Sequence, residues 1–364
     1  MNTNRMYLDI HVLQNVPPSC INRDDTGSPK TAVYGGATRA RVSSQAWKRA
    51  VRLYFRQTLA NEDMGERTKR IIPMVAEEIE RIDPHADSMK LARKVLETAD
   101  IGIKPKNEKK DDAKADLEGT GALFFLSHRQ AEALARFAVQ TPEKTWKKDA
   151  VKAILAEQPS VDMALFGRMV ASDPSLNIDA ACQVAHSIST HAVRNEFDYF
   201  TAVDDCSPED TAGAGHIGTI EFNSSVLYRY ATINLCELIA RLGEREAIAA
   251  ALAFAEAFIC SMPTGKQNTF ANRTLPDVVY IALRDDQPLN LVGAFEKPVR
   301  ANDGLLEPST RVFSNYARLI CEKYDMPPLM EFDLGGDITG RPSGGLKRMF
   351  EMLSEGLKQQ RGAL

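Results

Sequence analysis

Alternating apolar and polar positions mark the segments that we expect to form strands. Over residues 6–13, MYLDIHVL, every second residue is apolar, which is the period of a strand with one buried face. Residues 225–235 and 277–285 combine β-branched and aromatic residues in the same way. The first strand lies far from the other two, so the pattern predicts a sheet interrupted by a long insertion.

The segments between these strands have helical spacing. Ser43 or Ser44 is a good N-cap for a helix that runs to about Leu59. Residues 104–118 differ, because they hold five lysines, five acids and almost nothing apolar, which is typical of a solvated loop. The order strand, helix, helical block, strand, helix, strand predicts an α+β fold. Further helical patterns cover residues 60–100, 120–155, 176–193, 236–262, 308–324 and 343–359.

Cysteine usage and hydropathy indicate where the protein works. None of the six cysteines forms a CxxC pair, so we predict reduced thiols in a cytoplasmic protein. The N-terminal residues lack the apolar run of a signal peptide. Residues 247–262 are apolar but short and interrupted by Glu256, which favours a buried helix over a membrane span.

Positive charge is segregated near the N-terminus. The whole chain has a formal net charge of -4, yet residues 26–61 contain no Asp or Glu and seven Lys or Arg. On a helix at about 100° per residue, Gln45, Lys48, Arg49 and Arg52 share one face, opposite an apolar face that begins at Trp47. This nearly pure cationic face lacks the i,i+4 Glu–Lys pairs that stabilise most surface helices, so its cations repel each other.

A polyanion lying along this face would relieve the repulsion between its cations, although a solvated basic face is the plain alternative. The preceding loop favours the polyanion: Arg39 and Arg41 alternate, and Ser43 and Ser44 add hydroxyl and backbone donors at the helix N-terminus. Nucleic-acid phosphates fit better than a membrane, because no bulky apolar edge accompanies the charge. The segment has no GxxxxGK[ST] loop, which disfavours nucleoside triphosphate hydrolysis.

Three other segments offer weaker candidates. In residues 165–172, Arg168 and Met169 follow a glycine. Met169 is either buried at a helix end or an apolar wedge beside an Arg168 that reaches a phosphate. Residues 195–205 carry aromatic residues that belong to a core or stack bases. Residues 263–274 form a plain polar turn or a second phosphate-contacting loop.

Metal-binding chemistry has little support in the sequence. Cys182 and His186 would share a helix face, but no fourth ligand is in view, so packed or surface histidines are favoured. Asp24 and Asp25 could hold a metal for phosphodiester cleavage, although such a pair before a Gly/Ser/Pro loop more often forms a turn or pairs with an Arg.

Seven segments spread over the chain from end to end carry a family resemblance. They read HVLQNVPPSCINRDD, AVYGGATRARVSSQAWKRAVR, ALFGRMVAS, AHSISTHAV, DYFTAVDD, GTIEFNSSVLYRYATINL and LVGAFEKPVRANDG. In this order they resemble the CasC-type backbone subunits of the type I-E CRISPR surveillance complex Cascade. The first two segments together are specific to that family.

The resemblance implies a fold and a set of partners. It implies an RRM-like, ferredoxin-like palm over residues 1–57 and 181–364, a β-hairpin thumb at 194–224 and a helical finger insertion at 58–180. Copies would stack head to tail along one CRISPR guide RNA as a helical filament, and the guide would pair with a target DNA strand. Other Cascade subunits (large, small, and those that process the 5′ and 3′ ends of the guide) would complete the complex. No cofactor and no membrane are implied.

The resemblance also implies roles for particular residues. Met169 would wedge against bases from the fingers, and Tyr199, Phe200 and Thr201 would fold over a neighbouring subunit's guide segment. The remaining residues would hold guide phosphates: Arg23, Lys30, Ser43, Gln45, Lys48, Arg52, Lys266 and Gln267. Residues 58–120 match the family poorly, and the palm lacks the aromatic RNA-binding signature of ordinary RRM domains.

Three hypotheses remain. The leading one is a non-catalytic, sequence-independent RNA-binding subunit. The second is a metal-dependent ribonuclease that uses Asp24 or Asp25, for which no His or Lys stands in an obvious catalytic arrangement. The third is a structural oligomer with an incidental basic patch.

Overall fold

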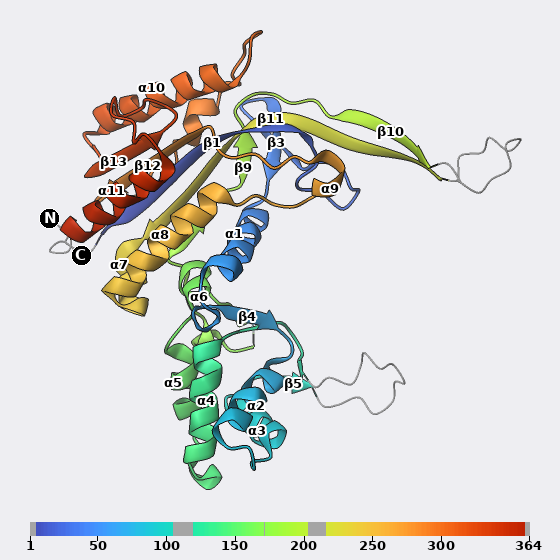
Figure 1. Cartoon of the computed structure of the whole chain (residues 1–364), viewed down its shortest axis with the longest axis vertical. Coiled ribbons are helices and arrows are strands. Elements are labelled where there is room, and N and C mark those ends of the chain that lie inside the picture. Colours follow the sequence, from blue (N-terminus) through green and yellow to red (C-terminus); the bar gives the residue numbers. More distant parts are fainter. Residues whose placement is uncertain (1–4, 105–118, 171, 203–215, 361–364) are drawn as a thin grey trace, which may run out of the picture. The chain divides into compact units, whose positions relative to one another are not determined.

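A computed structural model describes residues 5–104, 119–170, 172–202 and 216–360 (Figure 1). It divides into two compact units. The sheet unit comprises Met1–Tyr54, Val184–Cys236 and Ala251–Leu364, and the helical unit comprises Phe55–Gln183 and Glu237–Ala250. The loop expected at 104–118 falls outside the described residues apart from Lys104, as do residues 203–215 of the expected thumb.

The sheet unit is built on an antiparallel sheet in which β1 is an inner strand. β1 (Tyr7–Ser19) pairs with β11 (His216–Asn234) on one side and β12 (Val278–Arg284) on the other. The full order is β13-β12-β1-β11-β9-β3-β2. The other strands on this path are β2 (Thr31–Tyr34), β3 (Ala37–Val42), β9 (Ser187–Ser189) and β13 (Met330–Leu334), and β8 (Cys182–Val184) also pairs with β11.

The two faces of this sheet bury different residues. On one face, His11, Tyr228 and Tyr280 pack their rings against Phe313 of α10. On the other, Arg229 lies against aromatic rings of α1 and α8. The helices are α1 (Ser44–Thr58), α7 (Leu235–Leu242), α8 (Glu244–Cys260), α9 (Gln267–Phe270), α10 (Leu306–Tyr324) and α11 (Leu346–Gln359), with a 3₁₀ helix at Leu291–Phe295. The end of α1 from Phe55, α7 from Glu237 and α8 as far as Ala250 belong to the helical unit.

A two-stranded ribbon leaves the sheet where β11 continues beyond its pairing with β1. β10 (Glu196–Ala202) pairs with the first part of β11, from Glu196 opposite Phe222 to Ala202 opposite His216. Every residue of β10 is exposed. The ribbon therefore presents both of its faces, and Figure 1 shows it extending away from the sheet.

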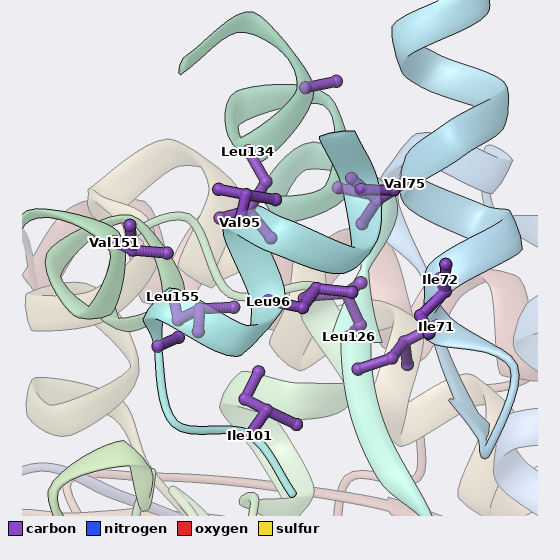
Figure 2. Packing of buried hydrophobic residues seen from close by; sticks show 14 of the residues in the cluster. Ile71, Ile72, Val75, Val95, Leu96, Ile101, Leu126, Leu134, Val151 and Leu155 are labelled. Atoms are coloured by element: carbon purple, nitrogen blue, oxygen red, sulfur yellow. The ribbon is translucent and has the colours of Figure 1, made fainter. Parts of the chain in front are cut away.

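The helical unit has its own core. Ile71, Ile72 and Val75 of α2 meet side chains of α3, α4, α5 and β7 in one buried cluster (Figure 2). Two short antiparallel pairs, β4–β7 and β5–β6, complete the unit. The elements are β4 (Gly65–Thr68), α2 (Ile71–Ile82), α3 (Ser88–Thr98), β5 (Ile103–Lys104), β6 (Gly119–Thr120), β7 (Phe124–Ser127), α4 (His128–Gln140), α5 (Lys148–Ala156) and α6 (Val161–Phe166), with 3₁₀ helices at Asn61–Asp63, Glu143–Thr145 and Pro174–Leu176.

The mixed α+β architecture with an antiparallel sheet confirms the predicted fold class, but two predicted helices are wrong. Residues 176–193 form β8 and β9, because their backbone pairs with β11 and β3. The helix expected over 236–262 ends at Leu242 and restarts at Glu244, since Gly243 adopts a φ of 81° that an L side chain rarely tolerates. Within the described residues, no helix has the length and apolar character needed to cross a bilayer.

Candidate nucleic-acid interface

Helix α1 presents the cationic face that the sequence predicts. Trp47 and Val51 are fully buried against the sheet unit, whereas Gln45 and Arg49 are exposed and Arg52, with Lys48, is partly exposed. The same helical projection places Leu53 on the apolar face, but this side chain is 36% exposed, whereas Phe55 is buried. The helix thus docks through every third or fourth residue and leaves its cations on the surface.

The N-terminus of α1 is capped from within the chain. The Ser43 hydroxyl accepts from the Ala46 backbone N–H at 3.3 Å, and the Ser44 N–H donates to Nδ1 of His186 at 3.2 Å. Arg41 approaches the same Nδ1 at 3.4 Å. Burial, together with the nearby charges of Arg41 and Lys30, lowers the pKa of His186, so a neutral ring accepts both donors. One backbone donor expected for phosphate is therefore already used.

Two loops that lie far apart in sequence meet beside this helix. A Cβ on Gly265 would lie 2.3 Å from the carbonyl oxygen of Ile21, so only glycine allows this approach. Burial raises the pKa of the Cys20 thiol, and the charges of Arg23 and Lys266 oppose that shift. A Cβ on Gly265 would also lie 3.1 Å from the Cys20 carbonyl oxygen, so Arg23 and Lys266 lie on neighbouring loops.

The second loop also reaches the base of the ribbon. Lys266 adopts a φ of 51° just before α9, and Gln267 is the first residue of that helix. Phe270, at the end of α9, packs against Phe222 of β11 with ring centroids 5.8 Å apart. This contact ties the Lys266 and Gln267 loop to the start of the ribbon.

A small cleft joins strands β1, β3 and β11 near these loops. Lys30 and Arg41 line it together with Asn22 and Asn223. The Asn22 side chain also accepts from the Ser43 N–H at 2.9 Å, which connects the 20–30 loop to the start of α1. Asn22 and Asn223 are not predicted as site residues from the sequence, and His186 is considered there only as a metal ligand, because their importance at this surface depends on contacts between distant segments.

Aromatic side chains stand on both faces of the ribbon. Tyr199 is 64% exposed and shares a face with Phe197 and Thr201, whereas Phe200 lies on the other face against Gly218. Exposed aromatic rings on a two-stranded ribbon suit stacking against bases. The predicted residues Tyr199, Phe200 and Thr201 are all accessible.

Arg39 is not a surface contact, which corrects the expectation that it points outward with Arg41. Its side chain is fully buried, and its guanidinium donates to the carbonyl oxygens of Tyr34, Ser189, Phe295 and Glu296 at 2.8–3.2 Å. Burial lowers its pKa. Arg39 therefore fastens β2 and β3 to the neighbouring strand and to the 3₁₀ helix.

Arg168 is likewise buried, and the expectation of a phosphate-reaching Arg is wrong there. It donates to the carbonyl oxygens of Leu176 at 2.9 Å and Leu155 at 2.8 Å, and burial lowers its pKa to about 10. The next residue, Met169, is 83% exposed and borders a cleft of about 550 Å³ that also includes Arg67. Arg168 thus supports the segment from which Met169 projects.

The acidic pair before the loop forms a turn. Asp24 Oδ1 accepts from the Thr26 N–H, the Thr26 hydroxyl and the Ser28 N–H at 2.7–3.0 Å, and these bonds lower its pKa. No cluster of three or more His, Cys, Asp or Glu side chains that could hold a metal occurs among the described residues. The arrangement at Asp24 gives the ribonuclease alternative no support.

Comparison with known proteins gives this surface a context. The chain matches the CT1975-like proteins over residues 8–338, nearly its whole length. It belongs to that family. A solved chain described as "CRISPR RNA-guided surveillance complex, pre-nicking" is 31% identical with a TM-score of 0.79, over 96% of this chain and all of that one. Another, described as "CRISPR RNA-guided surveillance complex", is 27% identical with a TM-score of 0.72, over 96% and 99%.

No curated protein matches this member of the CT1975-like family. The two solved chains confirm the resemblance to subunits of CRISPR surveillance complexes. The narrower assignment to the CasC type of type I-E complexes stays a prediction, as do the roles of individual residues.

Proposed function

We propose that this CT1975-like protein is a non-catalytic CRISPR RNA-binding backbone subunit of a type I-E Cascade complex. The cationic face of α1 carries the proposal. Lys48, Arg49 and Arg52 lie on an element without acids. Asn22 connects the start of this helix to the loop of Lys30, and the loop of Lys266 approaches the neighbouring Ile21. The likeness to two solved chains of RNA-guided surveillance complexes supports RNA as the polyanion.

The chemistry of this surface favours phosphate over bases. Lys and Arg side chains bind phosphates of any sequence, and the neutral donor Gln45 adds a hydrogen bond without a preference for one base. A guide held by its backbone leaves its base edges available for a target DNA strand. Base pairing, not this subunit, would then supply sequence specificity.

The other exposed groups complete the proposal. Tyr199, Phe200 and Thr201 on the ribbon would cover a neighbouring copy's guide segment, and Met169 would wedge between bases, filling the gap left by an unstacked base. Copies would stack head to tail along the guide, with other Cascade subunits at the ends and along the filament, in the cytoplasm.

We further propose that the sheet unit is an RRM-like palm. The order β12-β1-β11-β9, with α1 following β1 and α8 following β11, supports a ferredoxin-like arrangement. The palm at 1–57 and 181–364, the thumb at 194–224 and the fingers at 58–180 are the proposed divisions.

Removing two cations from α1 tests the proposed guide track. We expect the double variant Lys48→Ala, Arg52→Ala to bind single-stranded guide RNA about tenfold to a hundredfold more weakly in low salt, because two charge-assisted contacts are lost. The slope of log K against log salt concentration should become shallower by about 1.4, since each phosphate contact on a single strand contributes about 0.7. Fluorescence anisotropy of labelled RNA across a salt series measures both quantities.

A variant with two cations removed elsewhere serves as the control. Lys347 and Arg348 are exposed on α11, and Arg348 pairs with Glu351 at 3.3 Å. Lys347→Ala with Arg348→Ala changes the net charge equally and should leave the salt slope unchanged. Equal slopes for the wild-type protein and the α1 variant would refute the proposed guide track.

A further inference from the structure

A buried arginine lies directly beneath the cationic helix. Arg229 of β11 has no exposed surface, and its guanidinium contacts two aromatic rings that meet edge to face. It lies 3.8 Å from the ring centroid of Trp47 in α1 and 4.6 Å from that of Phe258 in α8. Both rings are themselves fully buried, so the cation and the two helices form one packed core.

This cation has no acidic partner among the described residues. The guanidinium donates to Gln14 Oε1 at 2.7 Å and to the Phe258 carbonyl oxygen, and its Nε finds no acceptor. Burial lowers the pKa of Arg229 to about 9, so the group stays charged at neutral pH. A buried charge without a carboxylate is a costly choice for stability alone, since apolar side chains fill such space at least as well.

The contacts of Arg229 extend to two elements of the candidate interface. Gln14 extends this hydrogen-bond network, because its Nε2 donates to the Thr274 carbonyl oxygen at 2.9 Å and to the Thr274 hydroxyl at 3.1 Å. Thr274 in turn donates to the Asn15 carbonyl oxygen at 2.9 Å. On the other side, Trp47 Nε1 donates to the Ser187 hydroxyl at 2.9 Å. One connected network thus joins α1, β1, β9, β11 and the segment that follows the Lys266 loop.

We infer that Arg229 is a positioning residue for guide binding, a role that rests on the proposed function. Trp47 directly precedes Lys48, so the ring that Arg229 holds sets the rotation of α1 about its axis and hence the direction of its cations. Through Gln14 and Thr274 the same guanidinium fixes the stem of the loop that carries Lys266 and Gln267. It holds both elements in register along one phosphate backbone.

Arg229→Met tests this role, because methionine fills similar space without the charge or the hydrogen bonds. We expect the folded variant to bind single-stranded guide RNA about tenfold more weakly, with a salt slope shallower by about 0.7, one phosphate contact. Arg229→Lys should recover part of the affinity. Combining Arg229→Met with Lys48→Ala and Arg52→Ala should add little further loss, since misplaced cations and absent cations remove the same contacts.

Tyr230→Phe is the matched control. Tyr230 is the next residue of β11 and donates to Asp9 at 2.9 Å on the opposite face of the sheet. Its loss should lower stability and leave the RNA affinity and salt slope unchanged. If Arg229→Met does not fold, Gln14→Met breaks the same network at its next member and should show the same shallower slope.

The outcomes separate this inference from the proposed function. If Lys48→Ala with Arg52→Ala weakens binding but Arg229→Met or Gln14→Met loses only stability, with the wild-type salt slope, Arg229 is structural and the inference fails. Full additivity with the α1 variant overturns it as well. If removal of Lys48 and Arg52 itself has no effect on binding, the guide track on α1 is wrong and the proposed function fails first.

Discussion

Replacing Arg39 by methionine should lower the free energy of unfolding by about 3–5 kcal/mol. The guanidinium donates to four carbonyl oxygens from three different segments, and all of these contacts lie within the sheet unit. Methionine fills the space but leaves several buried acceptors without a donor, each costing about 1–3 kcal/mol. Urea denaturation followed by Trp47 fluorescence, in a Trp146→Phe background, measures the change.

Two further variants distinguish a structural Arg39 from a phosphate contact. Arg39→Lys keeps the charge but cannot reach the same set of carbonyl oxygens, so it should also lose more than about 2 kcal/mol. Arg41→Ala, two residues along the same strand and partly exposed, should lose less than about 1 kcal/mol. A stable Arg39→Lys protein with weakened RNA binding would contradict the structural role.

Arg39 and Arg41 show what a period of two can and cannot predict. The segment before the helix is predicted as a loop, which is wrong, because Arg39 and Arg41 lie on β3. Their alternation is that of an extended backbone. It does not show which positions another segment covers. Phe295 and Glu296 reach Arg39 from more than 250 positions away, and no local pattern contains that contact.

The same distinction between local pattern and tertiary contact applies to the rest of the fold. Local periodicity is enough to predict β1, the core of β11, β12 and α1, because burial of one face of an element produces a regular pattern of apolar residues. Residues 176–193 mislead, since their apolar and polar residues also fit a helix, and only pairing with β11 and β3 makes them strands. Tertiary pairing overrides a weak local preference there.

The candidate site also combines features that a local pattern predicts with features that depend on distant contacts. The cations of α1 could be found from composition and helical projection, since an amphipathic helix needs only its own sequence. The approach of Gly265 to Ile21, the capping by His186 and the contact of Arg229 with Trp47 join segments more than 100 residues apart. Such contacts are consequences of packing, which a single sequence does not encode locally.

Replacing Arg168 by methionine should selectively destabilise the helical unit by about 3 kcal/mol. Arg168 joins the end of α5 to the segment before β8 through Leu155 and Leu176, and its Nη1 lies 3.4 Å from both the Phe125 carbonyl oxygen and Gln130 Oε1. Losing it leaves these buried acceptors without their cation. Hydrogen–deuterium exchange should show faster exchange in α4, α5 and β7 and little change in β1, β11 and β12.

The neighbouring residue provides the comparison. Met169 is 83% exposed, so Met169→Ala should change the free energy of unfolding by less than about 0.5 kcal/mol. If Met169 wedges against bases, this variant should instead alter the exposure of individual guide bases to chemical probes in the assembled complex. Equal stability losses for the two variants would contradict a supporting role for Arg168, because the loss of the exposed Met169 side chain leaves no buried acceptor without a donor. A larger stability loss in Arg168→Met, with a change in base probing only in Met169→Ala, would show that Arg168 supports the fold and that Met169 contacts the guide bases.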